Sequence, residues 1–397
     1  MVKKADSTAL QHIKVLDLTR VRSGPTCVRF FADFGAEVLK IESPDGIESN
    51  EGVIGSRDNY DNLNLHRNKR STTLNFKEPE GLEILYRLVK DADVVVENFR
   101  PDVKRRLKID YETLKKINPR IILGSISGFG QDGPYANRPG FDQISQGMGG
   151  LMSITGIPGQ GPVRAGIAVS DSTAGNYAAI GILIALLERE KSGEGQWVQS
   201  NLLQSMIGLC DFQAARYLVE KEIPPQAGND HPFSTPMGVY KSADGHFNIG
   251  ASGNGQYFAL CEVLDRLDLR DNQEFRTLKG RTANREYINK ELNKEFVKQP
   301  SKYWIEKLNE KSIPCGPIYN MEEVFADPQV QHLQAAVPVN DPTRGPIELV
   351  ATPVKLSRTP ATVSFTLHPK GSDNLELLQS LGYSMDEIQK LQDKKVI

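Results

Sequence analysis

The chain has 397 residues, of which 25% are charged and 39% hydrophobic, and its formal net charge is −2. This length suffices for two domains with a large buried core. Because the basic residues are spread along the chain and not gathered in one tail, we expect no nucleic-acid or membrane surface. The composition favours a protein that acts on small molecules.

The cysteines and the apolar runs argue against disulfide-rich, zinc-binding and membrane-spanning proteins. The four cysteines show no paired spacing, which argues against a disulfide framework and against a zinc site. They are Cys27, Cys210, Cys261 and Cys315. The longest apolar run, residues 178–187, is half the ~20 residues that a membrane span requires. The first ten residues carry lysines without an apolar segment behind them, so we expect a soluble, cytoplasmic protein.

The first 130 residues alternate β-rich runs with helical segments. Near-continuous apolar strands separated by crossover helices indicate a parallel sheet covered on both faces. Strands are predicted at 13–19, 36–42, 93–99 and 120–129, and helices at 23–34, 81–92 and 111–117. The predicted fold class is therefore α/β, with a Rossmann-like large domain.

The expected dinucleotide fingerprint is missing from this layout. The segment TRVRSGPTC, after the first strand, has one glycine, whereas G-x-G-x-x-G is needed to bring backbone against a pyrophosphate. Glu42 ends the second strand, where an acid that binds ribose would stand. Without the glycines this interpretation is disfavoured.

Later segments differ in character. Helices are predicted at 174–191 and 197–220, and the Pro224-Pro225 pair marks a break. A hairpin at 241–249 with an Asp244-Gly245 turn follows. The remaining predicted elements are helices near 254–266, 283–297 and 301–310, a strand-like stretch at 347–357 and a final helical pair.

One carboxylate, Asp171, lies between a small apolar segment and the predicted helix start at Ala174. Aspartate is a favoured helix N-cap, because its oxygen accepts a hydrogen bond from a free N–H of the first turn. Ser172 and Thr173 offer the same cap, so the helix does not need Asp171 for it. This stretch alone still favours a cap over a functional carboxylate.

Several motifs, taken together and in order, are specific. They are VLDLTRVRSGP with GAEVLKIE, HRNKRSTTLNFKEPEG, ADVVVENFRP, INPRIILGSISGFGQDGPY, RPGFDQISQGMGGLMSITG and the late GPIYNMEEVFADPQV. This set resembles the family III CoA-transferases, which include formyl-CoA and carnitine CoA-transferases. The late blocks are most similar to the succinate-hydroxymethylglutarate branch, which implies dicarboxylic acids as substrates.

The resemblance implies that Asp171 is the nucleophile of CoA transfer. Its carboxylate would attack the donor thioester, give a mixed anhydride and then an aspartyl-CoA thioester, which the acceptor acid attacks in turn. CoA thioester is then a substrate, and no permanently bound cofactor or metal is expected. A helix N-terminus favours the anion, and we expect the small residues Gly166, Ala168, Ala174 and Gly175 to leave space for the substrate.

The resemblance also implies CoA contacts from several segments. They are Arg22, Ser23, the strand Leu74–Lys77, Asn98, Phe99, Arg100, Arg106 and Arg138. Arg70, Lys77 and Arg106 would contact phosphates, and Phe99 would offer a face to the base. The alternative for such cations is solvated surface. The chain departs from the family pattern at Arg22, Asp102, Leu107-Lys108 and LHPKGSDN, which puts single contacts there in doubt.

Besides Arg22, four further positions are expected to serve substrate binding. Arg67 and His231, with Arg22, would bind a second carboxylate, and Gly228 would let the loop 228–236 move. The alternative for this loop is a plain turn. The fourth position, Phe141, would shape the pocket around the thioester.

Two other functions are weighed against transfer. An acyl-CoA racemase needs a His and Asp pair, but the histidine position holds Phe141, and a phenyl ring carries no proton. A non-catalytic CoA-binding or scaffold protein is disfavoured by Asp171.

The resemblance implies an architecture as well. A large domain would consist of residues 1–224 and 326–397, and a smaller α+β domain of residues 225–325. Two such subunits would form an interlocked homodimer. Its other partners would be an acyl-CoA and a free carboxylic acid.

Overall fold

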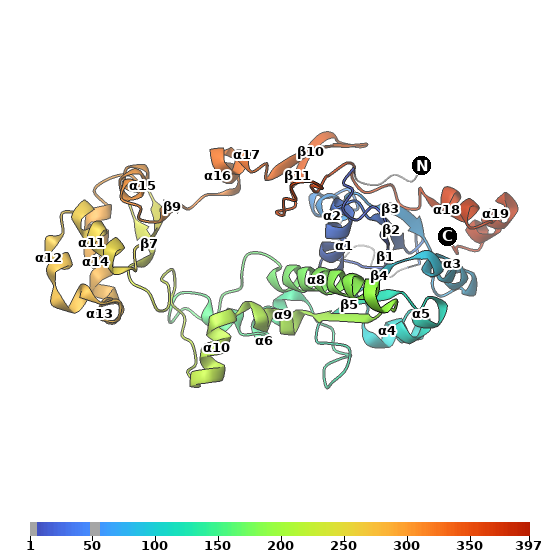
Figure 1. Ribbon diagram of the computed structural model, residues 1–397, viewed down its shortest axis with the longest axis horizontal. Helices are drawn as coiled ribbons and strands as arrows, with labels where there is room; N and C mark the ends of the chain where they lie inside the picture. The colour runs from blue at the N-terminus through green and yellow to red at the C-terminus, as the bar shows by residue number, and fades with distance from the viewer. Residues whose placement is uncertain (1–5, 48–55) are drawn as a thin grey trace. The chain divides into compact units, whose positions relative to one another are not determined.

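The computed structural model describes residues 6–47 and 56–397, so the very start of the chain, on which the expectation about a signal segment partly depends, lies outside the described residues. The chain forms two compact units (Figure 1). The first unit runs to Leu151 and adds Arg164–Lys221 and Gln329–Ile397. The second comprises Met152–Val163 and Glu222–Pro328, although the sequence-based division places 152–163 in the large domain.

The first unit is built on a parallel sheet of six strands in the order β3-β2-β1-β4-β5-β6. The strands are β1 (Lys14–Asp17), β2 (Glu37–Glu42), β3 (Arg70–Thr73), β4 (Val94–Glu97), β5 (Ile122–Ser127) and β6 (Trp197–Asn201). This is the doubly wound order, in which the direction of winding reverses between β1 and β4. Ligands of such sheets bind outside the carboxyl ends of the strands at that reversal.

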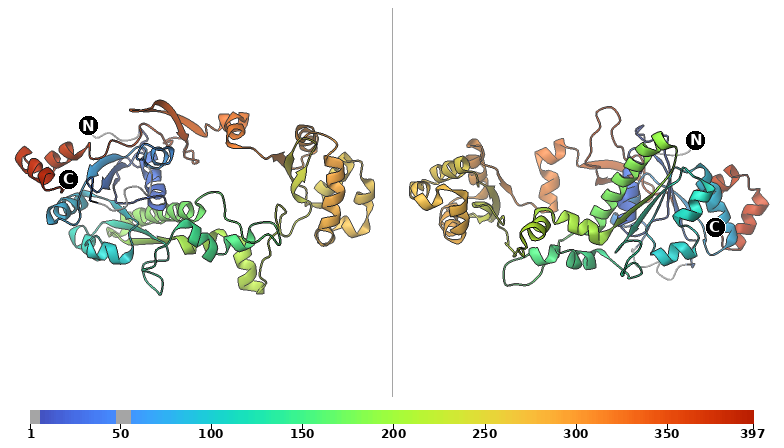
Figure 2. Two further views of the ribbon diagram at one scale, coloured as in Figure 1. Left: turned by 180° about the vertical axis from the view of Figure 1, so that it is seen from behind. Right: turned by 60° about the horizontal axis from the view of Figure 1, so that its bottom comes forward.

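Successive residues of the central strands point to opposite faces of the sheet and pack into two separate hydrophobic cores. Val94 and Val96 of β4 pack with α1 and α8, whereas Val95 packs on the other face with α3, α5, α18 and α19. Figure 1 shows α1 and α8 side by side, and the right view of Figure 2 shows α4 and α5 across the sheet from α8. These helices are α1 (Ser23–Asp33), α3 (Pro79–Asp91), α4 (Pro101–Arg106), α5 (Tyr111–Ile117), α8 (Val169–Ser192), α18 (Asn374–Ser380) and α19 (Met385–Asp393).

The remaining elements of the first unit connect or border this sheet. They are α2 (Tyr60–His66), α6 (Asp142–Met148), α9 (Leu202–Leu209), α10 (Asp211–Glu220), β10 (Ala336–Asp341) and β11 (Gly345–Val350), with α7 (Leu151–Ile154) and α17 (Pro328–His332) at the junctions between the units. Of the predicted strand-like stretch 347–357, only the part up to Val350 is strand: it belongs to β11, which pairs antiparallel with β10.

Two predictions of secondary structure for the first unit are wrong. Residues 197–220 are not one helix, because Trp197–Asn201 extends the sheet beside β5 and Asn201 caps α9 by accepting from the N–H of Gln204 at 2.8 Å. Leu74–Lys77 is not a strand but the turn after β3. Both segments are short, and whether each forms a strand depends on the neighbouring strand with which it can pair.

The second unit is α+β. Its sheet is antiparallel, in the order β7-β8-β9, and the predicted Asp244-Gly245 turn joins β7 to β8. Its elements are β7 (Met237–Lys241), β8 (His246–Gly250), α11 (Asn254–Val263), α12 (Leu267–Asp271), the 3₁₀ turn η1 (Gln273–Arg276), α13 (Leu278–Ala283), α14 (Arg285–Phe296), α15 (Ser301–Glu310), β9 (Cys315–Pro317) and α16 (Met321–Ala326). The short α12, η1 and α13 were not predicted.

The lengths of the helices test the expectation that the chain has no membrane-spanning segment. Over the described residues, no helix is both long and apolar enough to cross a membrane.

Candidate active site

Asp171 is the third residue of α8 and lies in its first turn, since the helix begins at Val169 and not at Ala174. It is half-buried. Burial and the negative charge of Asp142 raise the pKa of Asp171 to about 6, against the opposing effects of the Arg22 charge and a hydrogen bond from Ser23. The carboxyl therefore ionises near neutral pH in a partly desolvated position.

Asp142, not Asp171, satisfies the start of α8. Its Oδ1 accepts from the N–H and the hydroxyl of Ser170, both at 2.9 Å, and its Oδ2 accepts from Nε2 of Gln146 at 2.7 Å. The residue before the helix, Ala168, makes no side-chain cap. The interpretation of Asp171 as an N-cap is therefore wrong, because a carboxylate 28 residues upstream binds the first turn.

Gln146 fixes the loop that leads into α8. Its Oε1 accepts from the N–H of Ala165 at 2.9 Å, and its Nε2 donates to the carbonyl of Ile167 at 3.1 Å. Both Gln146 and Asp142 are buried on α6. The backbone on either side of Asp171 is thus held to a second helix.

Small residues let α8 approach α1 closely. A β-carbon on Gly175 would lie 2.4 Å from the carbonyl oxygen of Ser23. Ala174 and Gly175 are both buried in this contact, so their small size allows the two helices to pack closely. The expectation that these two residues leave space for the substrate is therefore wrong. Gly166, by contrast, is exposed and has nothing within 4 Å of the place its β-carbon would take.

The topological switch point brings two predicted CoA segments together. The side chain of Asn98, after β4, accepts from the N–H of Arg20 at 2.9 Å and donates to its carbonyl at 2.7 Å. The guanidinium of Arg20, after β1, lies 5.4 Å from the centre of the Phe99 ring. The loops that follow β1 and β4 are therefore one connected rim.

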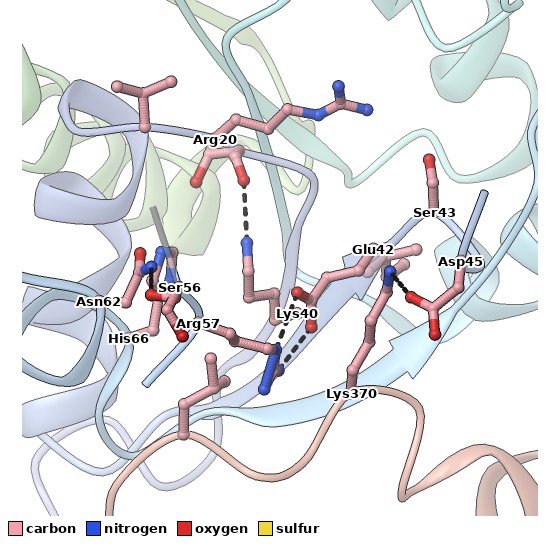
Figure 3. Close-up of a pocket in the computed structure, with 14 residues that line it drawn as sticks. Arg20, Lys40, Glu42, Ser43, Asp45, Ser56, Arg57, Asn62, His66 and Lys370 are labelled. Atoms are coloured by element: carbon pink, nitrogen blue, oxygen red, sulfur yellow. Dashed lines mark hydrogen bonds and ion pairs between the residues drawn. The ribbon is translucent and has the colours of Figure 1, made fainter. Parts of the chain in front are cut away.

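A cavity of about 390 Å³ opens beside this rim, at the carboxyl ends of β1 and β2 (Figure 3). Positive charges predominate around it. Its labelled polar lining consists of Arg20, Lys40, Glu42, Ser43, Asp45, Ser56, Arg57, Asn62, His66 and Lys370. Most of them could not be recognised from the sequence, because they come from segments far apart in the chain.

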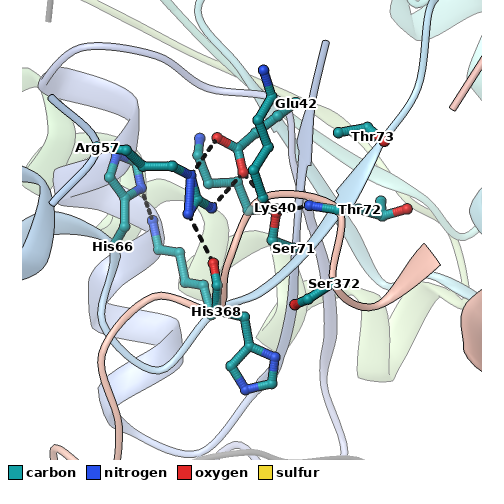
Figure 4. A network of polar contacts seen from close by, with 12 residues as sticks. Lys40, Glu42, Arg57, His66, Ser71, Thr72, Thr73, His368 and Ser372 are labelled. Atoms are coloured by element: carbon teal, nitrogen blue, oxygen red, sulfur yellow. Dashed lines mark hydrogen bonds and ion pairs between the residues drawn. The ribbon is translucent and has the colours of Figure 1, made fainter. Parts of the chain in front are cut away.

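Part of this charge is paired within the chain. Arg57 binds both carboxylate oxygens of Glu42, at 2.7 and 3.3 Å, and donates to the carbonyl of His368 (Figure 4). Glu42 also accepts from the hydroxyl of Ser71 at 2.7 Å. Glu42 is thus engaged by protein groups, which leaves no support for a ribose contact.

Beneath the cavity lies a buried ion pair. Lys69 binds Asp17 at 2.8 Å and contacts Nδ1 of His66 at 3.3 Å, and all three side chains are buried. Burial lowers the pKa of Lys69 to about 8 and that of His66 well below its usual value. His66 is therefore neutral at physiological pH. Lys40 donates to the carbonyl of Thr19 at 3.0 Å.

The structure corrects the prediction for Arg67. Its side chain is 0% exposed, and its guanidinium binds Asp33 at 2.7 Å as well as Asn64 and the carbonyl of Val350. Every nitrogen has a protein acceptor, so Arg67 anchors the chain and is not available to a substrate carboxylate. Arg70 is likewise buried, against Asp373 at 2.9 Å, and is not a free phosphate contact.

The other predicted CoA residues occupy varied places. Leu74 is buried in the core, Ser23 is buried at the start of α1, and Arg22 binds Asp61 at 2.6 Å. The remaining cations are exposed on the first unit: Lys77, Arg100, Arg106 and Arg138. For Leu74 only the backbone remains as a contact.

Phe141 stands directly before α6 and is 61% exposed. It adjoins Asp142 and hence the start of α8. The motif RPGFDQ had drawn attention to Phe141 alone, although the buried residue in it is Asp142.

Gly228 and His231 belong to the second unit. They line a cavity of about 560 Å³ with Asp230, Met237 and residues of β8 and β9. Gly228 has a φ of 60°, which suits glycine. The backbone of the loop is held, because Arg285 donates to the carbonyl of His231 at 2.8 Å.

Metal-ligand geometry is missing from the described part of the chain, where no three His, Cys, Asp or Glu side chains are grouped to hold an ion.

Comparison with known proteins defines the class of this α/β enzyme. The model of CoA-transferase family III matches residues 10–374. The chain therefore belongs to CoA-transferase family III and is a CoA-transferase, as the motifs predicted.

Individual relatives span most of the chain. A succinate–glutarate CoA-transferase of Agrobacterium fabrum is 38% identical over 88% of this chain and 90% of its own length. The human succinyl-CoA:glutarate CoA-transferase is 35% identical over 88% of this chain and 80% of its own length. A crystal structure of a CAIB/BAIF family protein from Brucella suis aligns with a TM-score of 0.82 at 33% identity, over 95% of this chain and 100% of that one.

Proposed function

We propose that the protein moves CoA from a dicarboxylyl-CoA, such as succinyl-CoA, to a free dicarboxylic acid, with Asp171 as the nucleophile. The observation that carries the proposal is the position of Asp171 in the first turn of α8, beside Ser23 and under the influence of Arg22. The substrate class is supported by the names of the two relatives, which pair succinyl or succinate with glutarate.

The proposed reaction exchanges activated carboxyl groups. Asp171 attacks the thioester carbonyl, the C–S bond breaks, and CoA leaves as a thiolate from an acyl-aspartyl anhydride. The thiolate then attacks the Asp171 carbonyl, which releases the donor acid and forms an aspartyl-CoA thioester. The acceptor carboxylate attacks that thioester, and the thiolate finally takes the acceptor acyl group and restores Asp171.

Residues around Asp171 stabilise the negative charges that the proposed reaction requires. With a pKa of about 6, Asp171 is mostly ionised at neutral pH and needs no base to activate it. Ser23 and Arg22 stabilise the carboxylate, and the dipole of α8 favours negative charge at its first turn. Asp142 and Gln146 keep that start in place.

We place the nucleotide of CoA at the carboxyl ends of β1, β2 and β4. The cavity there is rich in cations and is lined by Arg20, which in turn contacts Asn98 and Phe99. Phe99 would present a face to the base. The exposed Lys77, Arg100, Arg106 and Arg138 would reach phosphates, and Ser23 and the Leu74 backbone would border the pantetheine arm.

A homodimer is part of the proposal. One face of α8 packs on the sheet, but Tyr177, Ile180, Ile184 and Leu187 are 46–71% exposed on the other face. Their spacing places them on a single helical stripe. Such a stripe favours a second copy of the chain, and the family resemblance implies interlocked subunits. In this proposal Gly228 would let the loop 228–236 move, and His231 would bind a substrate carboxylate.

The test is to trap the intermediate. Wild-type protein incubated with succinyl-CoA and hydroxylamine should carry a hydroxamate at Asp171, found by mass spectrometry of peptides. Asp171→Ala should lose transfer by a factor of 10³ or more, on the order expected for loss of a covalent nucleophile, while CoA binding is retained. Label on another residue would move the nucleophile.

A second arm separates transfer from racemisation. In deuterium oxide a branched acyl-CoA should gain no α-deuterium while its CoA passes to glutarate, because addition to the carbonyl leaves the α-proton in place. Phe141 would then only shape the pocket. Enzyme-dependent α-deuteration without CoA transfer would contradict the proposal.

A further inference from the structure

Helix α1 presents a row of charged residues to α2. Arg22 directly precedes the helix, and Arg29 and Asp33 follow it by seven and eleven positions. Residues at these spacings share one helix face. Asp61, in the first turn of α2, lies opposite and binds Arg22 at 2.6 Å.

Asp33, at the far end of the row, is already neutralised. Arg67 binds it through Nε at 3.0 Å and Nη2 at 2.7 Å, and both side chains are at most 1% exposed. Asn68 adds a further hydrogen bond at 3.0 Å. Asp33 therefore has little charge left to balance a second arginine.

Arg29 is the unbalanced member. It is half-buried, and none of the described residues gives it a hydrogen bond or an ion pair. Its pKa is lowered by burial and by the positive charges of Arg67 and Arg22, with Asp33 and Asp61 opposing. Because the Cα–Cβ bonds of a helix tilt toward its N-terminus, the Arg29 side chain leans toward Arg22.

The facing sides of α1 and α2 thus bring together two guanidinium groups, those of Arg22 and Arg29, and one carboxylate that is not already neutralised, that of Asp61. Arg22 and Asp61 are each about one third exposed, at 33% and 31%, so water and ligands reach this pair. The excess positive charge also adjoins the nucleophile, since Arg22 lowers the pKa of Asp171. One further carboxylate would make this group of side chains electrically neutral.

We propose that Arg22, Arg29 and Asp61 form a subsite that selects the second carboxylate of a dicarboxylic substrate, with Asp61 holding Arg22 in the empty site. This inference rests on the proposed function. The bound carboxylate supplies the negative charge that Arg29 lacks, and Arg22 is shared between it and Asp61. A monocarboxylic acid leaves the excess charge unpaired.

The experiment compares two acceptors of equal chain length, glutarate and valerate, with succinyl-CoA as the common donor. The ratio of their kcat/KM values reports only the acceptor half-reaction, because the donor step is the same for both. Arg29→Met should lower the glutarate-to-valerate ratio by about 10- to 100-fold, the effect of losing one charge-assisted hydrogen bond. Arg29→Lys should restore part of it.

Asp61→Asn tests the opposite direction. Removing the competing carboxylate should raise the same ratio about two- to fivefold, the size expected of a partly exposed ion pair. This variant also decides the matter if Arg29→Met does not fold. The matched control is Arg87→Met on α3, an exposed arginine paired with Glu83, which should leave the ratio unchanged.

The outcomes are separable. If wild-type protein transfers CoA to neither acid, the proposed function fails. If it transfers CoA, but Arg29→Met lowers both kcat/KM values equally or Asp61→Asn leaves or lowers the ratio, the proposed function stands and the subsite is refuted.

Discussion

The carboxylate of Asp142 binds both the backbone N–H and the hydroxyl of Ser170, the residue directly before Asp171. The same group therefore orients the start of α8 and places a negative charge near Asp171, the proposed nucleophile. These two effects act on different observables. One fixes the geometry of Asp171, and the other raises its pKa.

We predict that Asp142→Asn moves the acid limb of transfer to lower pH. In the wild type kcat/KM should fall as pH drops through about 6, because Asp171, as the proposed nucleophile, must be ionised to attack. Without the charge of Asp142 the carboxylate ionises more readily. The measurement is kcat/KM from about pH 4.5 to 8, a range that brackets the pKa of Asp171.

Gln146→Ala is the control for this shift. It removes two hydrogen bonds from the loop before α8 but no charge. It should lower the rate while leaving the limb in place. An equal displacement of the limb in both variants would mean that geometry, and not charge, sets the pKa of Asp171.

We predict that Asp171→Asn raises stability at neutral pH. The folded-state pKa of about 6 lies above the ordinary aspartate value of 3.8, so folding favours the protonated form. Stability is therefore lost as pH rises from about 4 to 6 and stays reduced above that window. The variant escapes this loss, and its advantage in urea midpoint should be present at pH 7.5 and vanish near pH 4. An advantage that is constant with pH would refute the raised pKa.

The helix contact at Gly175 gives a prediction opposite in sign to helix propensity. Glycine to alanine inside a helix usually stabilises by about 1 kcal/mol. A β-carbon at Gly175, however, would meet the Ser23 carbonyl at 2.4 Å, and backbone cannot readily give way. We expect Gly175→Ala to lower the free energy of unfolding by about 1–3 kcal/mol and to slow transfer by displacing Ser23. Gly166→Ala, at an open position, should change the melting temperature little.

Arg67 illustrates where sequence patterns stop being informative. Residues 66–70, HRNKR, have the composition of a solvated loop, yet all five side chains are buried. Their counter-charges come from distant segments, Asp33 for Arg67 and Asp17 for Lys69. Local periodicity carries no trace of such pairs, so a cation destined for the core and a cation destined for a phosphate look alike.

The elements that were predicted correctly follow local rules. The strands β1, β2, β4 and β5 are apolar runs whose alternate residues serve two cores, and this pattern is visible in the sequence. Strand β6 was missed because Trp197–Asn201 is recognisable only beside β5. Asp171 was found through its motif, whereas Asp142 was not, since its partner Ser170 lies 28 residues away.

We predict a structural phenotype for Arg67→Met. Breaking a buried pair leaves Asp33 without its counter-ion and should cost about 3–5 kcal/mol in the free energy of unfolding. Any fall in transfer should track the loss of folded protein. The check is urea denaturation alongside KM for glutarate, and a raised KM in a variant of unchanged stability would return Arg67 to the substrate site.

The exposed stripe on α8 makes the last prediction. Ile184 and Leu187 are 61% and 71% exposed on a helix whose opposite face is buried against the sheet. Large apolar side chains in such a row are costly in water and favour a partner surface. Replacing both with glutamate would desolvate two charges in the proposed subunit interface, which costs far more than placing them on an open surface. The double variant should therefore shift the sedimentation coefficient from that of a dimer to that of a monomer at micromolar concentration, and it should lose transfer in parallel.

Lys116→Glu, exposed on α5, is the control, because it makes the same change of net charge away from the stripe and should sediment as the wild type does. A wild type that sediments as a monomer would refute the dimer outright, and a double variant that remains dimeric would place the interface elsewhere.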